Sequence, residues 1–240
     1  MLVCLDPGHG GSDPGATYGT LYEKTLTLAL VLALGRRLVD TYSVDVMYTR
    51  QDDRFVGLSE RARIANDARA NFFLSIHINA GGGEGYEDYI YPGTEKGATG
   101  RIRDVLHDYI AHFLQKLGVA DRGKKEADFA VLRETVMDAV LLEVLFIDSA
   151  KDRALLVSPE FQDQFAAAAA AGLADALQLP LRGTPTPAPT PAPTSSPGPE
   201  VLYRVQVGAF HDRQRADALA AELRQKGYPA IVLPESVAGH

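Results

Sequence analysis

Along most of the chain, short apolar runs alternate with longer segments whose apolar residues recur every three or four positions. Short apolar runs are typical of buried strands, and the longer spacing is typical of amphipathic helices. The pattern predicts strands at residues 2–6, 44–49, 72–78, 86–92, 129–133 and 139–146. It predicts helices at residues 23–42, 58–70, 100–117 and 159–178, the second capped by Ser59 and the last begun by Pro159. This alternation predicts an α/β fold, in which a mostly parallel twisted sheet carries helices on both faces.

A proline-rich stretch, GTPTPAPTPAPTSSPGPE at residues 183–200, interrupts the alternation. Proline recurs there at almost every second position, and no apolar side chain is larger than alanine. This composition cannot form a packed core and favours an extended polyproline-II spacer. We therefore expect a first domain at residues 1–181, a linker at residues 182–200 and a small α+β segment at residues 201–240.

Composition and charge narrow the possible partners. A chain of 240 residues that is 46% hydrophobic can bury a core of its own. Its net charge of −7 argues against nucleic acid or an anionic membrane surface as a partner. No run approaches the roughly 18 apolar residues of a membrane helix, and the first residues lack the pattern of a secretory signal. We therefore expect no membrane span. Either the protein is made without a leader and is released by cell lysis or by a leaderless route, or the sequence is a mature or trimmed form. The single cysteine, Cys4, is expected to be a buried, inert thiol.

Side chains that can bind a metal ion stand at the ends of predicted strands. His9 lies in the loop GHGGSDPGA directly after the first strand, and His77 lies at the end of FFLSIHI. Because ligand sites in open α/β sheets gather at the carboxyl ends of strands, we expect the two rings to converge. Glu23, at the start of the first long helix, adds a carboxylate, and this set is that of a catalytic zinc site with one open position. Taken singly, each residue also has a structural interpretation: a surface turn, a core histidine and an acid that complements the helix dipole.

Glu143 is the one charged residue in the apolar run AVLLEVLF. A buried, unpaired carboxylate is costly, and burial raises its pKa. A glutamate with a raised pKa is what metal-assisted hydrolysis uses as general base and then as general acid. The alternative is a glutamate that is exposed at a sheet edge or paired with Arg133.

The segments that carry these residues resemble the zinc-dependent N-acetylmuramoyl-L-alanine amidases of the amidase type 3 family, which cut bacterial peptidoglycan. In order, they are LDPGHGGSDPGA, YEKTLTLAL, TRQDD, LSERARIANDARANFFLSIHINA, GYEDYIYPG and RGKKEADFAVLRET followed by LLEVLFIDSAKD, over nearly all of residues 1–180. The resemblance implies that His9, Glu23 and His77 hold Zn²⁺. It also implies that Glu143 is the catalytic glutamate. The implied reaction is hydrolysis of the amide bond between the lactyl group of N-acetylmuramic acid and the L-alanine of the stem peptide.

Several positions beside the expected site depart from the family pattern. Leu145 stands where the family carries glycine, Asp148 and Ser149 follow where the family usually has an asparagine, and Asp138 stands where proline is common. Two alternatives therefore stay open. One is a non-catalytic cell-wall-binding or regulatory protein whose site these changes have closed, and the other is a zinc peptidase that cuts within the stem peptide. Arg50, Arg61 and Arg133 are conceivable catalytic helpers, with structural ion pairs as the alternative.

The last part of the chain resembles a SPOR domain, a small module that binds peptidoglycan, especially glycan strands stripped of stem peptides. The resemblance lies in the strand-like YRVQVGAF and the helical RADALAAELRQKGY. A SPOR fold needs two strand-helix-strand halves, and residues 201–240 supply one, so we expect a partial domain that is disordered unless it pairs. We expect His211 and His240 to be surface residues. The expected partners are the glycan strand and stem peptide of peptidoglycan, met by a monomer in the cell wall or outside the cell.

Overall fold

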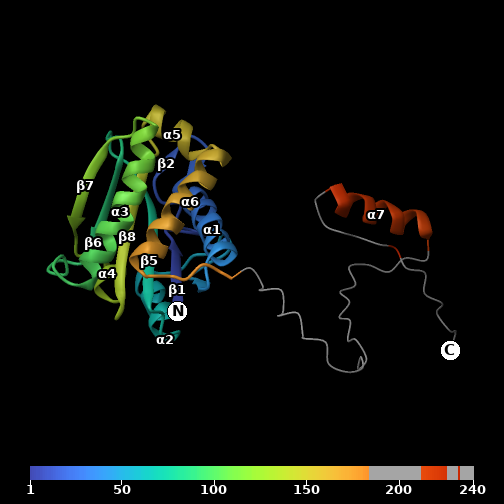
Figure 1. The fold of residues 1–240 in the computed structure, drawn as a ribbon. Helices are drawn as coiled ribbons and strands as arrows, with labels where there is room; N and C mark the ends of the chain where they lie inside the picture. Colours follow the sequence, from blue (N-terminus) through green and yellow to red (C-terminus); the bar gives the residue numbers. More distant parts are fainter. Residues whose placement is uncertain (184–211, 226–231, 233–240) are drawn as a thin grey trace, which may run out of the picture. The chain divides into compact units, whose positions relative to one another are not determined.

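The computed structural model describes residues 1–183, 212–225 and 232, and the chain divides into two units, Met1–Thr186 and Pro187–His240. The first unit contains a six-stranded sheet with the strand order β4-β1-β5-β8-β6-β7 (Figure 1). Its strands are β1 (Leu2–Pro7), β4 (Asp45–Tyr48), β5 (Phe72–Asn79), β6 (Tyr86–Ile90), β7 (Asp121–Glu126) and β8 (Asp138–Phe146). Two further short strands, β2 (Thr17–Tyr18) and β3 (Leu21–Tyr22), form a separate antiparallel pair.

The sheet is mostly parallel, as predicted. β4, β1, β5 and β8 are parallel neighbours, whereas β6 runs antiparallel to β8 and parallel to β7. The helices of this unit are α1 (Glu23–Thr41), α2 (Leu58–Asp67), α3 (Ala98–Lys116), α4 (Ala130–Arg133), α5 (Ala150–Leu156) and α6 (Pro159–Ala176). Most of them connect one strand to the next across the sheet, as parallel pairing requires.

Helices cover both faces of the sheet. Successive strand residues point to opposite sides, so the apolar side chains of one strand pack against helices on both faces. Leu74 and Ile76 of β5 belong to a large apolar cluster with residues of α1, α3 and α6. Phe73 directly precedes Leu74 and points to the opposite side of the sheet, where it belongs to a smaller cluster with Ala65 of α2 and Val131 of α4. We call these sides the α1 face and the α2 face.

The interior of β1 confirms the expectation for the single cysteine. Cys4 is fully buried in the smaller apolar cluster. Burial, with the nearby charge of Asp6, raises the pKa of its thiol to about 12. The thiol therefore stays protonated and unreactive.

Several local expectations were wrong. Residues 129–133 were expected as a strand, but Ala130–Arg133 form the short helix α4, and Val131 and Leu132 bury their side chains from this one helical turn. α2 begins after Gly57, and Ser59 is an exposed residue of its first turn rather than the cap. β7 was not expected, since DRGKKE has no apolar side chain to mark a strand. The expectation that Pro159 begins the last helix of this unit is confirmed.

In the second unit the structure describes helix α7 (Arg213–Gln225), which overlaps the helix predicted at residues 215–228. The strand predicted at residues 203–210, with His211 and His240, lies outside the described residues. The domain boundaries given above stay predictions.

Candidate metal and catalytic site

The three expected metal ligands come together at the carboxyl ends of β1 and β5. His9 follows β1, His77 lies in β5, and Glu23 is the first residue of α1. One ligand atom from each lies within 4.8 Å of the other two. Nε2 of His9 is 3.1 Å from Oε2 of Glu23, and Nδ1 of His77 is 3.1 Å from Oε1. The three side chains therefore form a candidate metal site.

Glycines make this close approach possible. A Cβ on Gly8 would collide with the ring of His77, and a Cβ on Gly15 would lie 2.6 Å from Oε2 of Glu23. Gly15 also has a φ of 66°, which side chains rarely adopt. The glycine-rich loop thus serves to bring backbone against the three ligands.

His9 itself is held in an unusual conformation. Its φ is 60°, in the left-handed region where a non-glycine residue is strained. Nδ1 of its ring is 2.8 Å from Oδ2 of Asp13, and its carbonyl accepts a 2.6 Å hydrogen bond from Arg61 Nη2. A carboxylate on one ring nitrogen orients the other toward a metal. Asp13 therefore supports the ligand role of Nε2.

Glu23 is buried but stays ionised. Its Oε2 accepts a 2.8 Å hydrogen bond from Ala16 N, and its Oε1 accepts a 2.9 Å bond from Ile78 N. Burial alone would raise the pKa of Glu23, but hydrogen bonds with the rings of His77 and His9 outweigh it and hold the pKa well below its usual value. An ionised carboxylate is the form that binds a cation.

Glu143 lies one strand away from His77, which is its partner in the β5–β8 register. Its Oε2 is buried and has no hydrogen-bond partner among the described residues. Burial raises the pKa of Glu143 to about 7; the charge of His77 opposes the rise and that of Glu23 adds to it. Both structural alternatives are excluded. Glu143 is not exposed at a sheet edge, because β8 lies between β5 and β6, and it is not paired with Arg133, which bonds Asp128.

The side chains of Leu145 and Asp138, two of the departures from the family pattern, both lie away from the carboxylate of Glu143. Leu145 has a φ of 68° at a bulge in β8, a conformation that costs a non-glycine residue about 1–2 kcal/mol. Its side chain is fully buried in the large apolar cluster, on the α1 face and away from the ligands. Asp138 begins β8, about 17 Å along the strand from Glu143, and accepts a hydrogen bond from Thr99.

The arginines proposed as helpers are structural in this arrangement. Arg61 forms a buried ion pair with Asp6, 2.7 Å long, beneath the glycine-rich loop. Arg50 is fully buried and donates hydrogen bonds to the carbonyls of Gly8 and Lys24. These bonds fix the backbone that presents the ligands.

A polar cluster beside Glu143 was missed by the sequence analysis. Glu87 of β6 is opposite Glu143 in the antiparallel pair and is buried. Its carboxylate accepts hydrogen bonds from Asn79, Tyr89, Arg122 and Lys125. Burial would raise the pKa of Glu87, but the bonds from Lys125 and Arg122 lower it to about 2. The alternation of residues in YEDYI predicts that Glu87 and Asp88 point to opposite faces of the sheet. Only the strand order shows that Glu87 lies opposite Glu143.

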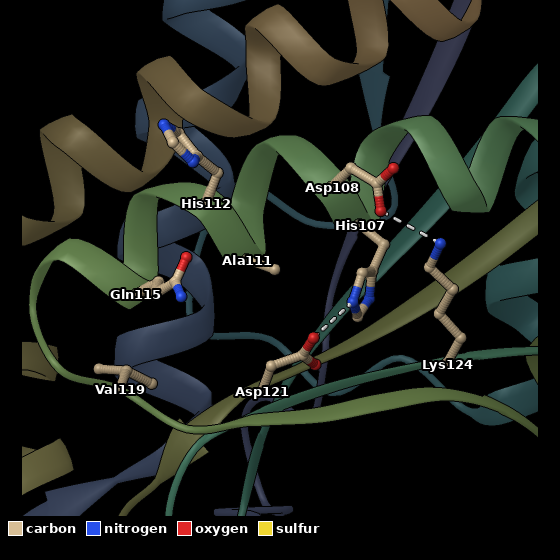
Figure 2. A pocket seen from close by; sticks show the side chains of 8 residues that line it. All are labelled: His107, Asp108, Ala111, His112, Gln115, Val119, Asp121 and Lys124. Carbon is tan, nitrogen blue, oxygen red and sulfur yellow. Dashed lines mark hydrogen bonds and ion pairs between the residues drawn. The ribbon is translucent and has the colours of Figure 1, made fainter.

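A second histidine–carboxylate cluster occupies the α1 face. His107 of α3 is buried, with Nδ1 2.7 Å from Oδ2 of Asp88 and Nε2 3.2 Å from Oδ2 of Asp121. It lines a pocket of about 580 Å³ between α3 and β7 (Figure 2). Asp88 follows Glu87 in β6 and so points to the opposite face of the sheet. The pocket is therefore separate from the candidate metal site.

The fold and the site together define a class: an α/β protein with a histidine-rich metal site and an adjacent buried glutamate, as in metal-dependent hydrolases. Residues 3–175 match the N-acetylmuramoyl-L-alanine amidase family, and residues 199–240 match the SPOR domain. The chain belongs to the N-acetylmuramoyl-L-alanine amidase family.

Individual relatives agree with this assignment. The chain is 43% identical over 234 residues to the N-acetylmuramoyl-L-alanine amidase CwlM of Bacillus licheniformis, covering 97% of this chain and 85% of the relative. It is 44% identical over 235 residues to the sporulation-specific N-acetylmuramoyl-L-alanine amidase of Bacillus subtilis strain 168, covering 97% and 84%. The solved catalytic domain of CwlV from Bacillus (Paenibacillus) polymyxa var. colistinus is similar with a TM-score of 0.69 and 37% identity, over 74% of this chain and 98% of that domain.

The predicted family, fold class and activity are thus confirmed. The chain is a peptidoglycan hydrolase, and its activity is that of an N-acetylmuramoyl-L-alanine amidase. The SPOR match supports peptidoglycan as the partner and association with the cell wall. Within the described parts of the chain, no helix has both the length and the apolar character needed to cross a membrane.

Proposed function

We propose that the amide bond between N-acetylmuramic acid and L-alanine is cut at a zinc ion held by His9, Glu23 and His77. Glu143 serves as general base and then as general acid. One observation carries this proposal: three ligand atoms converge within 4.8 Å, and the free carboxylate oxygen of Glu143 lies one strand away.

The donor set suits zinc. Two imidazole nitrogens and one carboxylate leave a fourth position open, which is the arrangement of catalytic zinc sites. Each oxygen of Glu23 accepts one backbone hydrogen bond and keeps further lone-pair capacity for a metal. Bound there, zinc would polarise the scissile carbonyl and lower the pKa of a water molecule.

Glu143 supplies the proton transfers. Its carboxylate takes a proton from the water as the water oxygen bonds to the lactyl carbonyl carbon. When the carbon–nitrogen bond breaks, the same proton passes to the leaving nitrogen of L-alanine, and Glu143 is ionised again. A pKa of about 7 suits both directions of transfer, because a group of this strength gives and takes protons near neutral pH.

We also propose that residues 201–240 bind glycan strands and that residues 182–200 act as the spacer to the catalytic unit of a monomeric enzyme. The SPOR match over residues 199–240 supports the binding role. Proline at almost every second position supports the spacer role.

The test is digestion of purified peptidoglycan by the zinc-loaded chain and by its Glu143→Gln variant, with mass spectrometry of the soluble products. The chain should release stem peptides that begin with L-alanine, and Glu143→Gln should slow release about 10²- to 10⁴-fold, the usual effect of losing a general base. Glu60→Gln is the matched control. The side chain of Glu60 is exposed on α2 and pairs with Arg63 of the same helix, so this variant should leave the rate unchanged.

Two results would contradict the proposal. Fragments cut within the stem peptide would indicate a peptidase. No release despite one zinc per chain would indicate a wall-binding protein.

A further inference from the structure

Two cations share one carboxylate beside the candidate active site. Nε of Arg122 is 2.7 Å and Nζ of Lys125 is 2.5 Å from the same atom, Oε2 of Glu87. Within the described residues, Glu87 is the only carboxylate that forms an ion pair with either side chain. The group therefore keeps one uncompensated positive charge. Each cationic side chain is about a third exposed, 37% and 35%, so its remaining N–H donors reach solvent.

This positive charge lies on the same face of the sheet as the reacting groups. His77 pairs with Glu143 across β5 and β8, and Glu143 pairs with Glu87 across β8 and β6. Paired residues on neighbouring strands point to the same side, about 4.8 Å apart. Glu87 and its cations thus lie on the α2 face, roughly 10 Å from His77. The guanidinium of Arg122 is further held over the ring of Phe146, 4.9 Å from its centroid.

We propose that Arg122 and Lys125 bind a free carboxylate of the stem peptide, on the residue that follows L-alanine. This inference rests on the proposed function, because it takes the scissile bond to lie between the zinc ligands and Glu143. The sugar part of the substrate offers hydroxyl and acetamido groups there, whereas the stem peptide carries carboxylates. An extended chain spans about 3.4 Å per residue, so a carboxylate two residues beyond the scissile bond reaches about 7 Å. With the scissile bond between β5 and β8, Glu87 on β6 lies about one and a half strand spacings away, which is also about 7 Å.

The arrangement gives the enzyme a way to sense amidation of the stem peptide. A carboxylate would accept hydrogen bonds from both cations and neutralise their excess charge, whereas an amide at the same position has one acceptor oxygen and no negative charge. The contact with Arg122 and Lys125 also orients the substrate. The stem peptide lies over β6 and β7, and the glycan lies toward the glycine-rich loop after β1. A phosphate-bearing wall polymer would meet the same charge, but nothing would hold it at a set distance from the scissile bond.

The test uses the full chain and two synthetic tripeptides, L-alanyl-γ-D-glutamyl-L-lysine amide with the glutamyl α-carboxylate free or amidated. Isothermal titration should show the free acid binding about five- to tenfold more tightly, the effect of a partly exposed charged contact. Arg122→Gln and Lys125→Gln should each bring this ratio close to one. Both variants keep one cation on Glu87, so the fold should persist, which circular dichroism checks.

Lys124→Gln is the matched control. Lys124 lies between the two cations in sequence but bonds Asp104 and Asp108 of α3, toward the other face of the sheet. This variant should keep the preference for the acid.

Several outcomes would overturn the inference: equal affinity for the two peptides, a preference that survives in both variants, no binding of either peptide, or displacement of the acid peptide by glycerol phosphate at equal concentration. A chain that binds the acid peptide through these cations and releases no stem peptides from the wall would contradict the proposed catalysis alone.

Discussion

Two histidine–carboxylate clusters lie on opposite faces of the same sheet and are arranged differently. On the α2 face, the rings of His9 and His77 share the carboxylate of Glu23, and Asp13 contacts the other nitrogen of His9. On the α1 face, the single ring of His107 lies between the carboxylates of Asp88 and Asp121. Both clusters contain residue types that bind metals, but their geometry is different.

The difference decides what each cluster can do. The rings of His9 and His77 each direct a nitrogen to a common point, where lone pairs can meet a cation. His107 also has a carboxylate at each ring nitrogen, as His9 has, but among the described residues no second histidine ring converges with it. Burial would lower the pKa of His107, but the hydrogen bond with Asp88 and the charges outweigh it and raise that pKa, which favours a ring with both nitrogens protonated. A metal site therefore needs convergent lone pairs, and the presence of histidine and carboxylate is insufficient.

The largest expected effect separates the two clusters by activity. His77→Ala should abolish zinc binding and lower the amidase rate by more than about 100-fold, because even partners that only orient a ligand contribute 10- to 100-fold. His107→Gln should keep zinc and the rate per folded molecule. Zinc content by mass spectrometry and release of stem peptides measure both. Loss of zinc from His107→Gln would contradict the conclusion that the cluster around His107 takes no part in metal binding.

A smaller effect separates them by stability. His107→Ala leaves Asp88, which is fully buried, without its closest cationic partner. Removing one member of a buried ion pair costs about 3 kcal/mol of the free energy of unfolding. His112→Ala, an exposed histidine on the same helix, is the control and should change the free energy of unfolding by less than about 0.5 kcal/mol. Equal losses in the two variants, measured by denaturant unfolding, would show that the buried contacts of His107 contribute nothing.

The smallest effect is the pH dependence of that stability. Because the pKa of His107 is raised in the folded chain, its contribution is complete below the unfolded value and is lost as pH rises through the folded value. The groups that face it are Asp88 of β6, Asp121 of β7 and the ring of Tyr86. The difference in free energy of unfolding between the chain and His107→Gln should therefore be larger near about pH 6 than near about pH 9. A difference that does not change with pH would show that the ring is neutral throughout.

Much of the fold and of the site could be predicted from local pattern. Apolar runs marked the strands that became β1, β5 and β8, since a buried strand shows its burial in its own residues. The rule that ligands gather at carboxyl ends of strands pointed to His9 and His77, and the geometry places their rings together. The resemblance to amidases added the reaction and the roles of the residues. Those roles stay predictions until the variants are measured.

What the sequence determined by itself was local: which segments form strands and helices, and which side chains are unusual for their surroundings, such as Glu143 in an apolar run. The tertiary structure was needed to show which side chains from distant segments lie next to one another. The order β8-β6-β7 sets Glu87 and its two cations beside Glu143, and it turns Asp88 toward His107 on the other face. Strand order depends on contacts between segments far apart in the chain, and no local periodicity encodes which strand pairs with which.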